Sequence, residues 1–241
     1  MSTQRVCGTV VVLLVTGALA GQAMANAVFN YTSHERYPYY EGNVNNGGYD
    51  ENWDEYNGST GPWTVDIAGG PAFEDYFIDT ATGMQSNIGT DEITYTGYAS
   101  MDWDVGPYEW SWPDTFAGVA SRMYIKFTVD EPLTLELTYD VGTEVPTGDD
   151  CQVYSNVRLH DLTEGVTLFN YGVGSGAGTT TVNVEPGRTY WYICKNDLAL
   201  GTDDDPASGY WRDDVTATLT IVPEPGALGL LLVAAAALRR R

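Results

Sequence analysis

The chain of 241 residues is 43% hydrophobic, enough to build a sizeable core in one large domain or two small ones. Eleven Lys and Arg residues stand against 33 Asp and Glu residues, which gives a formal net charge of −22. This acidity excludes nucleic acid as the default partner, because phosphate binding needs clustered positive charge, and it disfavours docking on anionic lipid. Seventeen Tyr, seven Trp and 27 Gly residues are typical of a β-rich extracellular protein.

The N-terminal segment has the three parts of a secretory signal peptide in order. Arg5 supplies a positive charge, residues 10–20 form an apolar run, and Ala23-Met24-Ala25 provides a small-residue cleavage site. An N-terminal membrane anchor is the alternative, but the apolar run is too short to span about 30 Å of hydrocarbon. We therefore expect export through the Sec machinery and cleavage after Ala25, with cleavage at Ala20 as the alternative.

The body of the chain is predicted to consist of strands. It shows no sustained apolar period of 3.6 residues, whereas alternation with period two is frequent. The alternating or turn-bounded runs expected to be strands cover residues 63–68, 75–79, 93–104, 121–129, 133–141, 156–162, 166–171, 179–185, 189–195 and 215–221. Their spacing predicts an all-β fold, an antiparallel β-sandwich of jelly-roll-like type, in one domain because no linker divides the body.

An immunoglobulin-like sandwich is the alternative topology. Tyr192 precedes Cys194 by two residues, as in the tyrosine corner of that fold. However, no Trp lies between Trp112 and Trp191 to fill the place of the expected core Trp. The jelly-roll-like arrangement is therefore preferred.

Aromatic residues gather in two parts of the body. The first group, interleaved with Asn, Gly, Asp and Glu, consists of Tyr31, Tyr37, Tyr39, Tyr40, Tyr49, Trp53, Tyr56 and Trp63. The second consists of Trp103, Tyr108, Trp110 and Trp112. Exposed rings stack on sugar rings while amides and carboxylates bind hydroxyls, so Trp103, Trp110 and Trp112 are the candidates for binding a polysaccharide. The alternative is that the rings cover the core of the sandwich.

Two cysteines remain in the body once Cys7 is removed with the signal peptide. Cys151 and Cys194 in an exported chain indicate one disulfide. The alternative is a pair of free thiols.

Candidate metal ligands are the adjacent carboxylates of Asp203, Asp204 and Asp205, whose mutual repulsion a calcium ion would relieve; the alternative is a solvated acidic loop. No other cofactor is expected. His160 and Asp161 are neighbours on a strand and point to opposite faces, so they form no ready catalytic dyad. We expect no enzymatic activity. A secreted carbohydrate-active enzyme is a further alternative, because paired carboxylates are available in so acidic a chain.

The C-terminal segment combines three features in order. The first is a proline-containing motif, Val222, Pro223, Glu224 and Pro225. An uncharged apolar run follows over residues 226–238, and the chain then has a basic end, Arg239, Arg240 and Arg241. This order resembles the PEP-CTERM sorting signal of bacterial exosortase substrates. A buried C-terminal helix is the alternative, and it leaves the three arginines and the Pro-Glu-Pro motif unexplained.

Together with this resemblance, the sequence patterns predict a chain of three parts: a signal peptide over residues 1–25, a β-sandwich body over 26–221 and a sorting and anchor segment over 222–241. The resemblance implies transient anchoring in the inner membrane, processing by an exosortase near Pro223-Glu224-Pro225, and release to the cell surface or extracellular matrix. The family is associated with bacteria that make exopolysaccharide. The expected function is therefore that of a non-enzymatic surface or matrix protein, with a polysaccharide-binding module as the alternative.

Overall fold

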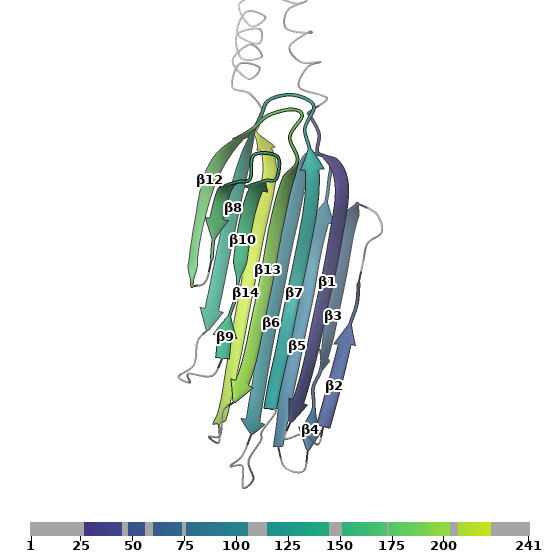
Figure 1. The fold of residues 1–241 in the computed structure, drawn as a ribbon, viewed down its shortest axis with the longest axis vertical. Helices are drawn as coiled ribbons and strands as arrows, with labels where there is room; N and C mark the ends of the chain where they lie inside the picture. Colours follow the sequence, from purple (N-terminus) through teal and green to yellow (C-terminus); the bar gives the residue numbers. More distant parts are fainter. Residues whose placement is uncertain are drawn as a thin grey trace, which may run out of the picture.

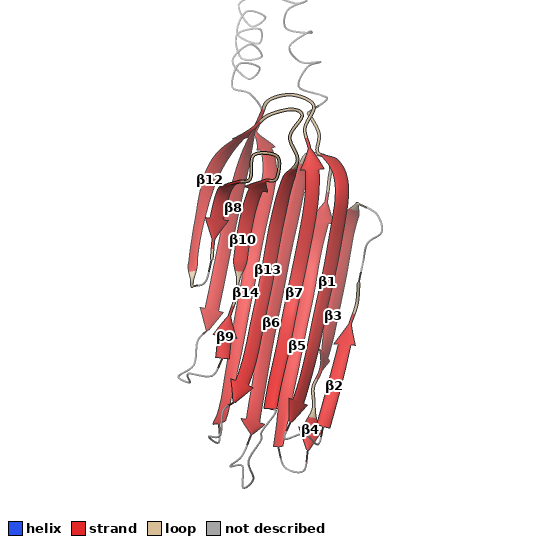
Figure 2. Cartoon of the chain, viewed as in Figure 1, coloured by secondary structure: helices blue, strands red, loops and turns tan. Residues whose placement is uncertain are grey.

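The computed structural model describes residues 27–44, 48–55, 60–73, 76–105, 115–144, 151–172, 174–202 and 207–222. In these ranges the regular structure consists entirely of β-strands (Figure 2). No helix within them is long and apolar enough to cross a membrane.

The strands form two antiparallel sheets packed face to face (Figure 1), which confirms the predicted β-sandwich. Sheet A has the order β11-β10-β13-β7-β1-β2, with β9 beside β13. Its strands are β1 (Asn30–Val44), β2 (Gly48–Trp53), β7 (Thr115–Thr128), β9 (Cys151–Val153), β10 (Asn156–Asp161), β11 (Val166–Tyr171) and β13 (Tyr190–Thr202). Sheet B has the order β12-β8-β14-β6-β5-β3, with β4 beside β5. Its strands are β3 (Gly61–Gly69), β4 (Ala72–Phe73), β5 (Tyr76–Ile88), β6 (Glu92–Val105), β8 (Leu133–Glu144), β12 (Gly176–Val184) and β14 (Ala207–Val222).

The interior contains two apolar clusters that follow one another along the strands. On β13, for example, Tyr192 and Cys194 belong to the larger cluster and Leu198 and Leu200 to the smaller one. Asn196 lies between them and is fully buried. Every second side chain of β13 therefore faces the interior, and at Asn196 that side chain is polar.

Polar side chains from both sheets meet at this level, and we call Tyr95, Ser121, Thr143, Asn196 and Asp213 the polar belt. The hydroxyl of Tyr95 donates to Oδ1 of Asn196 at 2.7 Å, and Nδ2 of Asn196 donates to Oδ2 of Asp213 at 2.7 Å. The hydroxyl of Thr143 donates to Oδ1 of Asp213 at 2.8 Å. Burial raises the pKa of Asp213, and its hydrogen bonds to Thr143 and Asn196 oppose that rise. The belt thus holds a buried acid between the two clusters.

A corner of the tyrosine type is present, but at a different residue from the one the sequence suggested. The N–H of Glu185 donates to the hydroxyl of Tyr190 at 2.7 Å, at the connection from β12 to β13. Tyr192, two residues further along, is instead fully buried in the core.

The predicted disulfide between Cys151 and Cys194 is wrong. Cys194 is a free, buried thiol, and burial raises its pKa to about 12. Cys151 lies opposite Leu200, six residues further along β13 than Cys194. At about 3.3 Å per residue this separation is roughly 20 Å, whereas a disulfide needs Cα atoms within about 7 Å.

Strand β1 begins and strand β14 ends at the same end of the sandwich (Figure 1). The N–H of Phe29 donates to the carbonyl of Thr90, and the N–H of Ile221 donates to the carbonyl of Asp91, each at 2.9 Å. Both strands are therefore attached to the turn between β5 and β6. Val222, the first residue of the predicted sorting segment, is the last residue of β14.

Several predicted features lie outside the described residues. They are the signal peptide with Ala23 and Ala25, and the remainder of the sorting segment with Pro223, Glu224, Pro225, Arg239, Arg240 and Arg241.

Candidate functional site

Trp103 is wrong as a residue of a glycan-binding surface, because it belongs to the core. Its side chain on β6 is only 6% exposed, and its ring meets that of Trp211 edge-on with centroids 6.2 Å apart. The same alternation that buries Met101 also turns Trp103 inward. Trp110 and Trp112 lie outside the described residues.

Five aromatic side chains instead form a row across the outer face of sheet A. They are Trp53 on β2, Tyr37 and Tyr39 on β1, Tyr124 on β7 and Trp191 on β13, and we call them the aromatic row. Tyr39 lies directly opposite Trp53 in the register of β1 and β2. Ring centroids are 6.3 Å apart between Tyr37 and Tyr39, 5.9 Å between Tyr37 and Tyr124, and 5.9 Å between Tyr124 and Trp191. The row therefore crosses four neighbouring strands.

Strand β1 presents its tyrosines outward because of its two-residue period. Arg36 and Tyr40 are buried, whereas Tyr37 and Tyr39 on the alternate positions are partly exposed. The guanidinium of Arg36 is enclosed in the sandwich and donates to the carbonyl of Gly61 on β3 at 3.0 Å. This contact links the two sheets directly beneath the outward-facing rings.

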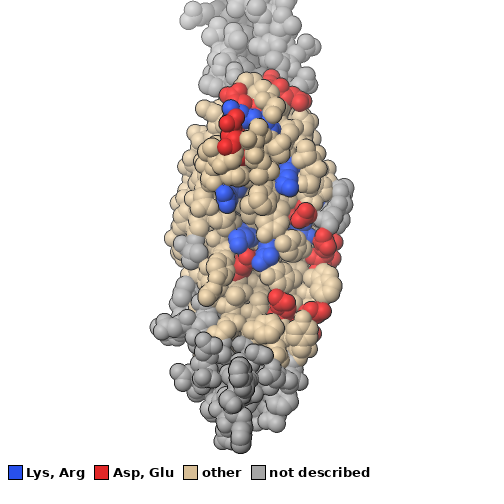
Figure 3. Space-filling view, in the orientation of Figure 1, with Lys and Arg blue, Asp and Glu red and all other residues tan. Residues whose placement is uncertain are grey.

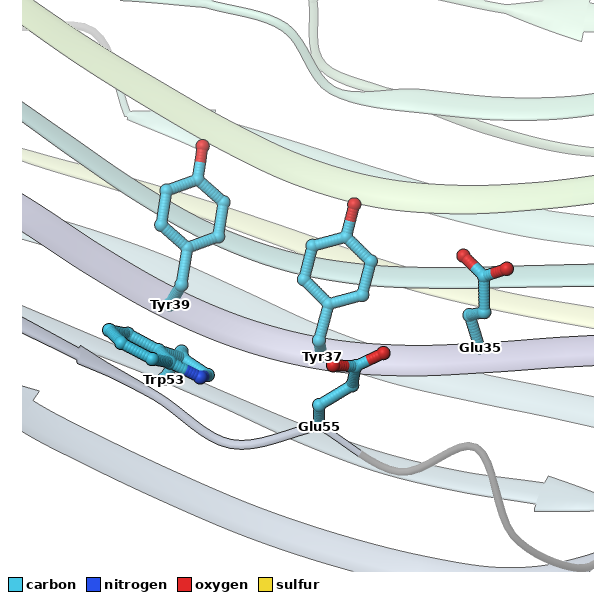
Figure 4. A pocket seen from close by; sticks show the side chains of 5 residues that line it. All are labelled: Glu35, Tyr37, Tyr39, Trp53 and Glu55. Carbon is cyan, nitrogen blue, oxygen red and sulfur yellow. The ribbon is translucent and has the colours of Figure 1, made fainter.

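A hollow of about 410 Å³ lies at the β2 end of the aromatic row (Figure 4). Tyr37 and Tyr39 stand side by side along β1, and Trp53 and Glu55 come from β2 and the segment after it. Glu35 and Glu55 complete the lining. Trp53 is 62% exposed, the highest value among the described large hydrophobic side chains. The hollow thus combines apolar ring surface with carboxylate acceptors and is open to solvent.

Arg122 fixes the middle of the row. Its guanidinium lies 4.9 Å from the ring centroid of Tyr39 and 5.8 Å from that of Tyr37, and it donates to both oxygens of Asp197 at 2.7 and 3.0 Å. Burial alone would lower the pKa of Arg122, but the hydrogen bonds and charge of Asp197 raise it above its ordinary value. Burial, with Tyr37 nearby, raises the pKa of Tyr124. Arg122 also donates to the hydroxyl of Tyr39 at 2.9 Å, so a permanent cation holds the middle of the row in place.

Basic side chains concentrate on this face, although the chain is acidic. In Figure 3 the blue Lys and Arg atoms are spread over the middle of the face, and red atoms lie mostly toward its rim. Residues 26–222 contain seven basic residues. Four of them, Arg122, Lys126, Arg158 and Lys195, lie on outward positions of β7, β10 and β13 in sheet A.

The other residues singled out in the sequence are not part of this surface. Asp161 is buried and bound by Arg188 at 3.0 Å, while its neighbour His160 contacts Thr167 on the outer face. The carboxylates of residues 203–205 lie outside the described ranges. Within those ranges, no group of three or more His, Cys, Asp or Glu side chains is placed to hold a metal ion.

Comparison with known proteins gives no family assignment. No protein-family model matches the chain, and no curated protein matches it. A structure of infectious bursal disease virus, Gx strain, has a TM-score of 0.26 and 10% identity, covering 82% of this chain and 60% of that one. The VP2 subviral particle of the same virus has a TM-score of 0.24 and 10% identity, covering 84% and 59%. This chain thus spans less than two thirds of either, and TM-scores this low do not establish a shared fold.

Sequence reasoning found the first aromatic group but not its division between core and surface. Tyr40 is 5% exposed, whereas Tyr39 next to it belongs to the aromatic row. A signal was present in the order Tyr37-Pro38-Tyr39-Tyr40, because strand alternation places Tyr37 and Tyr39 on one face and Tyr40 on the other. This order separates surface rings from core rings only if the segment is already known to be a strand.

Proposed function

We propose that this is an exported, non-enzymatic protein of the cell surface or extracellular matrix, and that it binds polysaccharide through the aromatic row. The observation that carries the binding proposal is the row itself. Aromatic rings on an outward sheet face, beside an open hollow with carboxylates at its edge, offer stacking surfaces and hydroxyl acceptors together. A sugar chain needs both, because its C–H faces are apolar and its hydroxyls must remain hydrogen-bonded.

Export rests on the two terminal segments of the sequence. The signal peptide over residues 1–25 directs Sec-dependent export, and the segment over 222–241 is sorted by an exosortase after transient anchoring in the inner membrane. The end of β14 at Val222 supports this division, because a folded body that ends there leaves the proline motif next to it in sequence. No resident cofactor is required. The calcium ion expected at residues 203–205 stays a prediction from the sequence.

A jelly-roll-like wrapping of the sandwich is part of the proposal. Its support is that consecutive strands lie in different sheets at β2 to β3, β6 to β7, β7 to β8, β8 to β9, β11 to β12, β12 to β13 and β13 to β14. Such repeated exchange between two sheets is typical of jelly rolls.

Polysaccharide binding is tested by replacing Trp53 with alanine. We expect the wild-type protein, produced as residues 26–222, to bind on a glycan array and to insoluble polysaccharide. Trp53→Ala should bind about tenfold more weakly, because removing an aromatic ring that contacts the ligand commonly costs more than 1 kcal/mol. Tyr210→Ala is the matched control, since Tyr210 is 44% exposed on the other sheet and should leave binding unchanged.

Failure of the wild-type protein to bind any glycan would overturn the binding proposal. Equal losses in the Trp53 and Tyr210 variants would show that the aromatic row is not the site. Release of new reducing ends from the same polysaccharides would replace the proposed function with that of a carbohydrate-active enzyme.

The sorting proposal predicts a defined C-terminus. In the native host, intact-mass analysis of the released protein should place its end close to residue 222, and replacing Pro223, Glu224 and Pro225 with alanine should retain the protein in the membrane fraction. Recovery of released protein that still contains Arg241 would contradict the proposal.

A further inference from the structure

We propose that the polysaccharide is acidic, and that a uronate sugar binds where Trp191, Lys126 and Arg158 lie together at one end of the aromatic row; we call these three residues the basic end. This inference rests on the proposed function and adds the chemical class of the ligand. The two ends of the aromatic row differ in charge. The hollow at Trp53 has carboxylates at its edge, whereas the basic end has cations.

The register of sheet A brings these residues together. Trp191 on β13 lies directly opposite Lys126 on β7 and directly opposite His160 on β10. Nζ of Lys126 is 5.7 Å from the centre of the Trp191 ring. Arg158 lies on β10 two residues before His160, and the same outward alternation places it on this face. Neighbouring strands are about 4.8 Å apart, so the two cations flank the Trp191 ring within the width of three strands.

Lys126 and Arg158 form no ion pair among the described residues, whereas the four other basic residues outside the core do. Arg122 and Lys195 both bind Asp197, and Arg188 binds Asp161. Arg212, on sheet B, pairs with Asp214. Lys126 is exposed.

Arg158 is held in place by Thr167 and His160 rather than by a carboxylate. Its guanidinium donates to the hydroxyl of Thr167 at 2.9 Å and lies 3.4 Å from Nδ1 of His160. A guanidinium positioned in this way retains N–H groups for a carboxylate, which it binds with a matching planar geometry.

The overall negative charge does not prevent an acidic glycan from binding here. On this face the acidic residue next to the basic end is Glu35, which lies opposite Tyr124 on β7. Glu35 forms no ion pair with Lys126 or Arg158 among the described contacts. Most of the remaining acidic residues on strands face outward from sheet B, and packed sheets are about 10 Å apart. At physiological ionic strength charges more than about 8 Å apart through solvent are largely screened, so the local cations decide the interaction.

The test compares ligands that differ in charge. Binding of alginate oligomers, which are uronates, of neutral dextran oligomers and of sulfated dextran is measured by titration calorimetry at 20 and 150 mM salt. We expect the wild-type protein to prefer alginate over dextran. Lys126→Gln with Arg158→Gln should weaken alginate binding at least tenfold and leave dextran binding unchanged, because each loses a charged hydrogen-bond donor. Arg212→Gln is the matched control on the other sheet and should not affect either ligand.

The outcomes separate the two proposals. Dextran binding as tight as alginate binding, and dependent on Trp53, leaves the proposed function standing and overturns the inference. Alginate binding that survives the double substitution also overturns it. Equal binding of sulfated dextran overturns the assignment to uronates. Absence of all glycan binding overturns the proposed function as well. Lys126→Gln alone, at an exposed position, is the variant to use if Arg158→Gln does not fold.

Discussion

Replacing Asn196 with leucine is expected to lower the free energy of unfolding by about 3–5 kcal/mol, as for other buried charges that lose a partner. The amide of Asn196 accepts a hydrogen bond from Tyr95 and donates one to the carboxylate of Asp213. Leucine has a similar size but no polar atoms. Thr143 would then be the remaining hydrogen-bond donor of the polar belt to that carboxylate, in a site where both Asn196 and Asp213 are fully buried.

The loss should depend on pH in a definite direction. Burial already raises the pKa of Asp213, and removing a donor to its charged form raises it further. A carboxyl whose pKa is higher in the folded than in the unfolded state destabilises the fold when ionised, and the destabilisation decreases as pH falls through the folded-state pKa. Asn196→Leu should therefore cost more at pH 7 than at pH 5.

Urea unfolding at the two pH values measures both effects, with Asn183→Leu as the control. Asn183 is exposed on the edge strand β12, where its Oδ1 accepts a hydrogen bond from Thr134. Its replacement should change stability by less than about 0.5 kcal/mol. A similar small loss in Asn196→Leu, or a loss that grows on acidification, would show that the polar belt does not hold a charged Asp213.

The sandwich could be predicted from sequence wherever the buried face of a strand is apolar. The run predicted over residues 166–171 agrees with β11, and Leu135 and Leu137 are buried at alternate positions of β8 as expected. Strand β13 was predicted to end at residue 195 but continues to Thr202. The prediction stopped early because Asn196 interrupts the apolar pattern, although it occupies an inward position of the polar belt.

Strand β1 was not predicted for a related reason, and therefore the division of the first aromatic group between core and surface was missed. Its inward positions include Arg36, Pro38 and Gly42, none of which marks a buried face in a sequence. Their burial depends on sheet B, where Arg36 finds the carbonyl of Gly61 and a hydroxyl acceptor on Ser86. Such partners lie far away in sequence, so the pattern within β1 cannot reveal them. The pairing of β1 with β2, which brings Trp53 to Tyr39, is equally a tertiary property.

Replacing Gly70 with alanine is expected to destabilise the sandwich by at least about 2 kcal/mol, through backbone strain and overpacking. Gly70 connects β3 to β4 with φ of +154°, a conformation that residues with a β-carbon rarely adopt. A β-carbon there would overlap the carbonyl oxygen of Ile78, which belongs to the backbone of β5 and cannot rotate away. The N–H of Ile78 donates to the carbonyl of Pro71, so the corner has little freedom to open.

Gly70→Ala should also weaken glycan binding at the aromatic row. The N–H of Gly70 donates to Oδ2 of Asp50 at 3.1 Å, and the hydroxyl of Tyr40 donates to the same oxygen at 2.9 Å. Asp50 lies on β2, the edge strand that carries Trp53. Movement of the Gly70 corner therefore loosens the strand that forms one wall of the hollow, and glycan binding should weaken even at temperatures where the variant is folded.

Thermal unfolding and glycan binding of Gly70→Ala are to be compared with Gly142→Ala. Gly142 lies in β8 with an ordinary backbone conformation, and a β-carbon there would meet no atom within 4 Å. Its replacement should leave binding unchanged and stabilise the protein by about 0.4–1 kcal/mol, because alanine reduces the entropy of the unfolded chain. Equal stability of the two variants would disprove the steric role of Gly70. Destabilisation of Gly70→Ala with full glycan binding in the folded state would instead show that β2 is held in place without this corner.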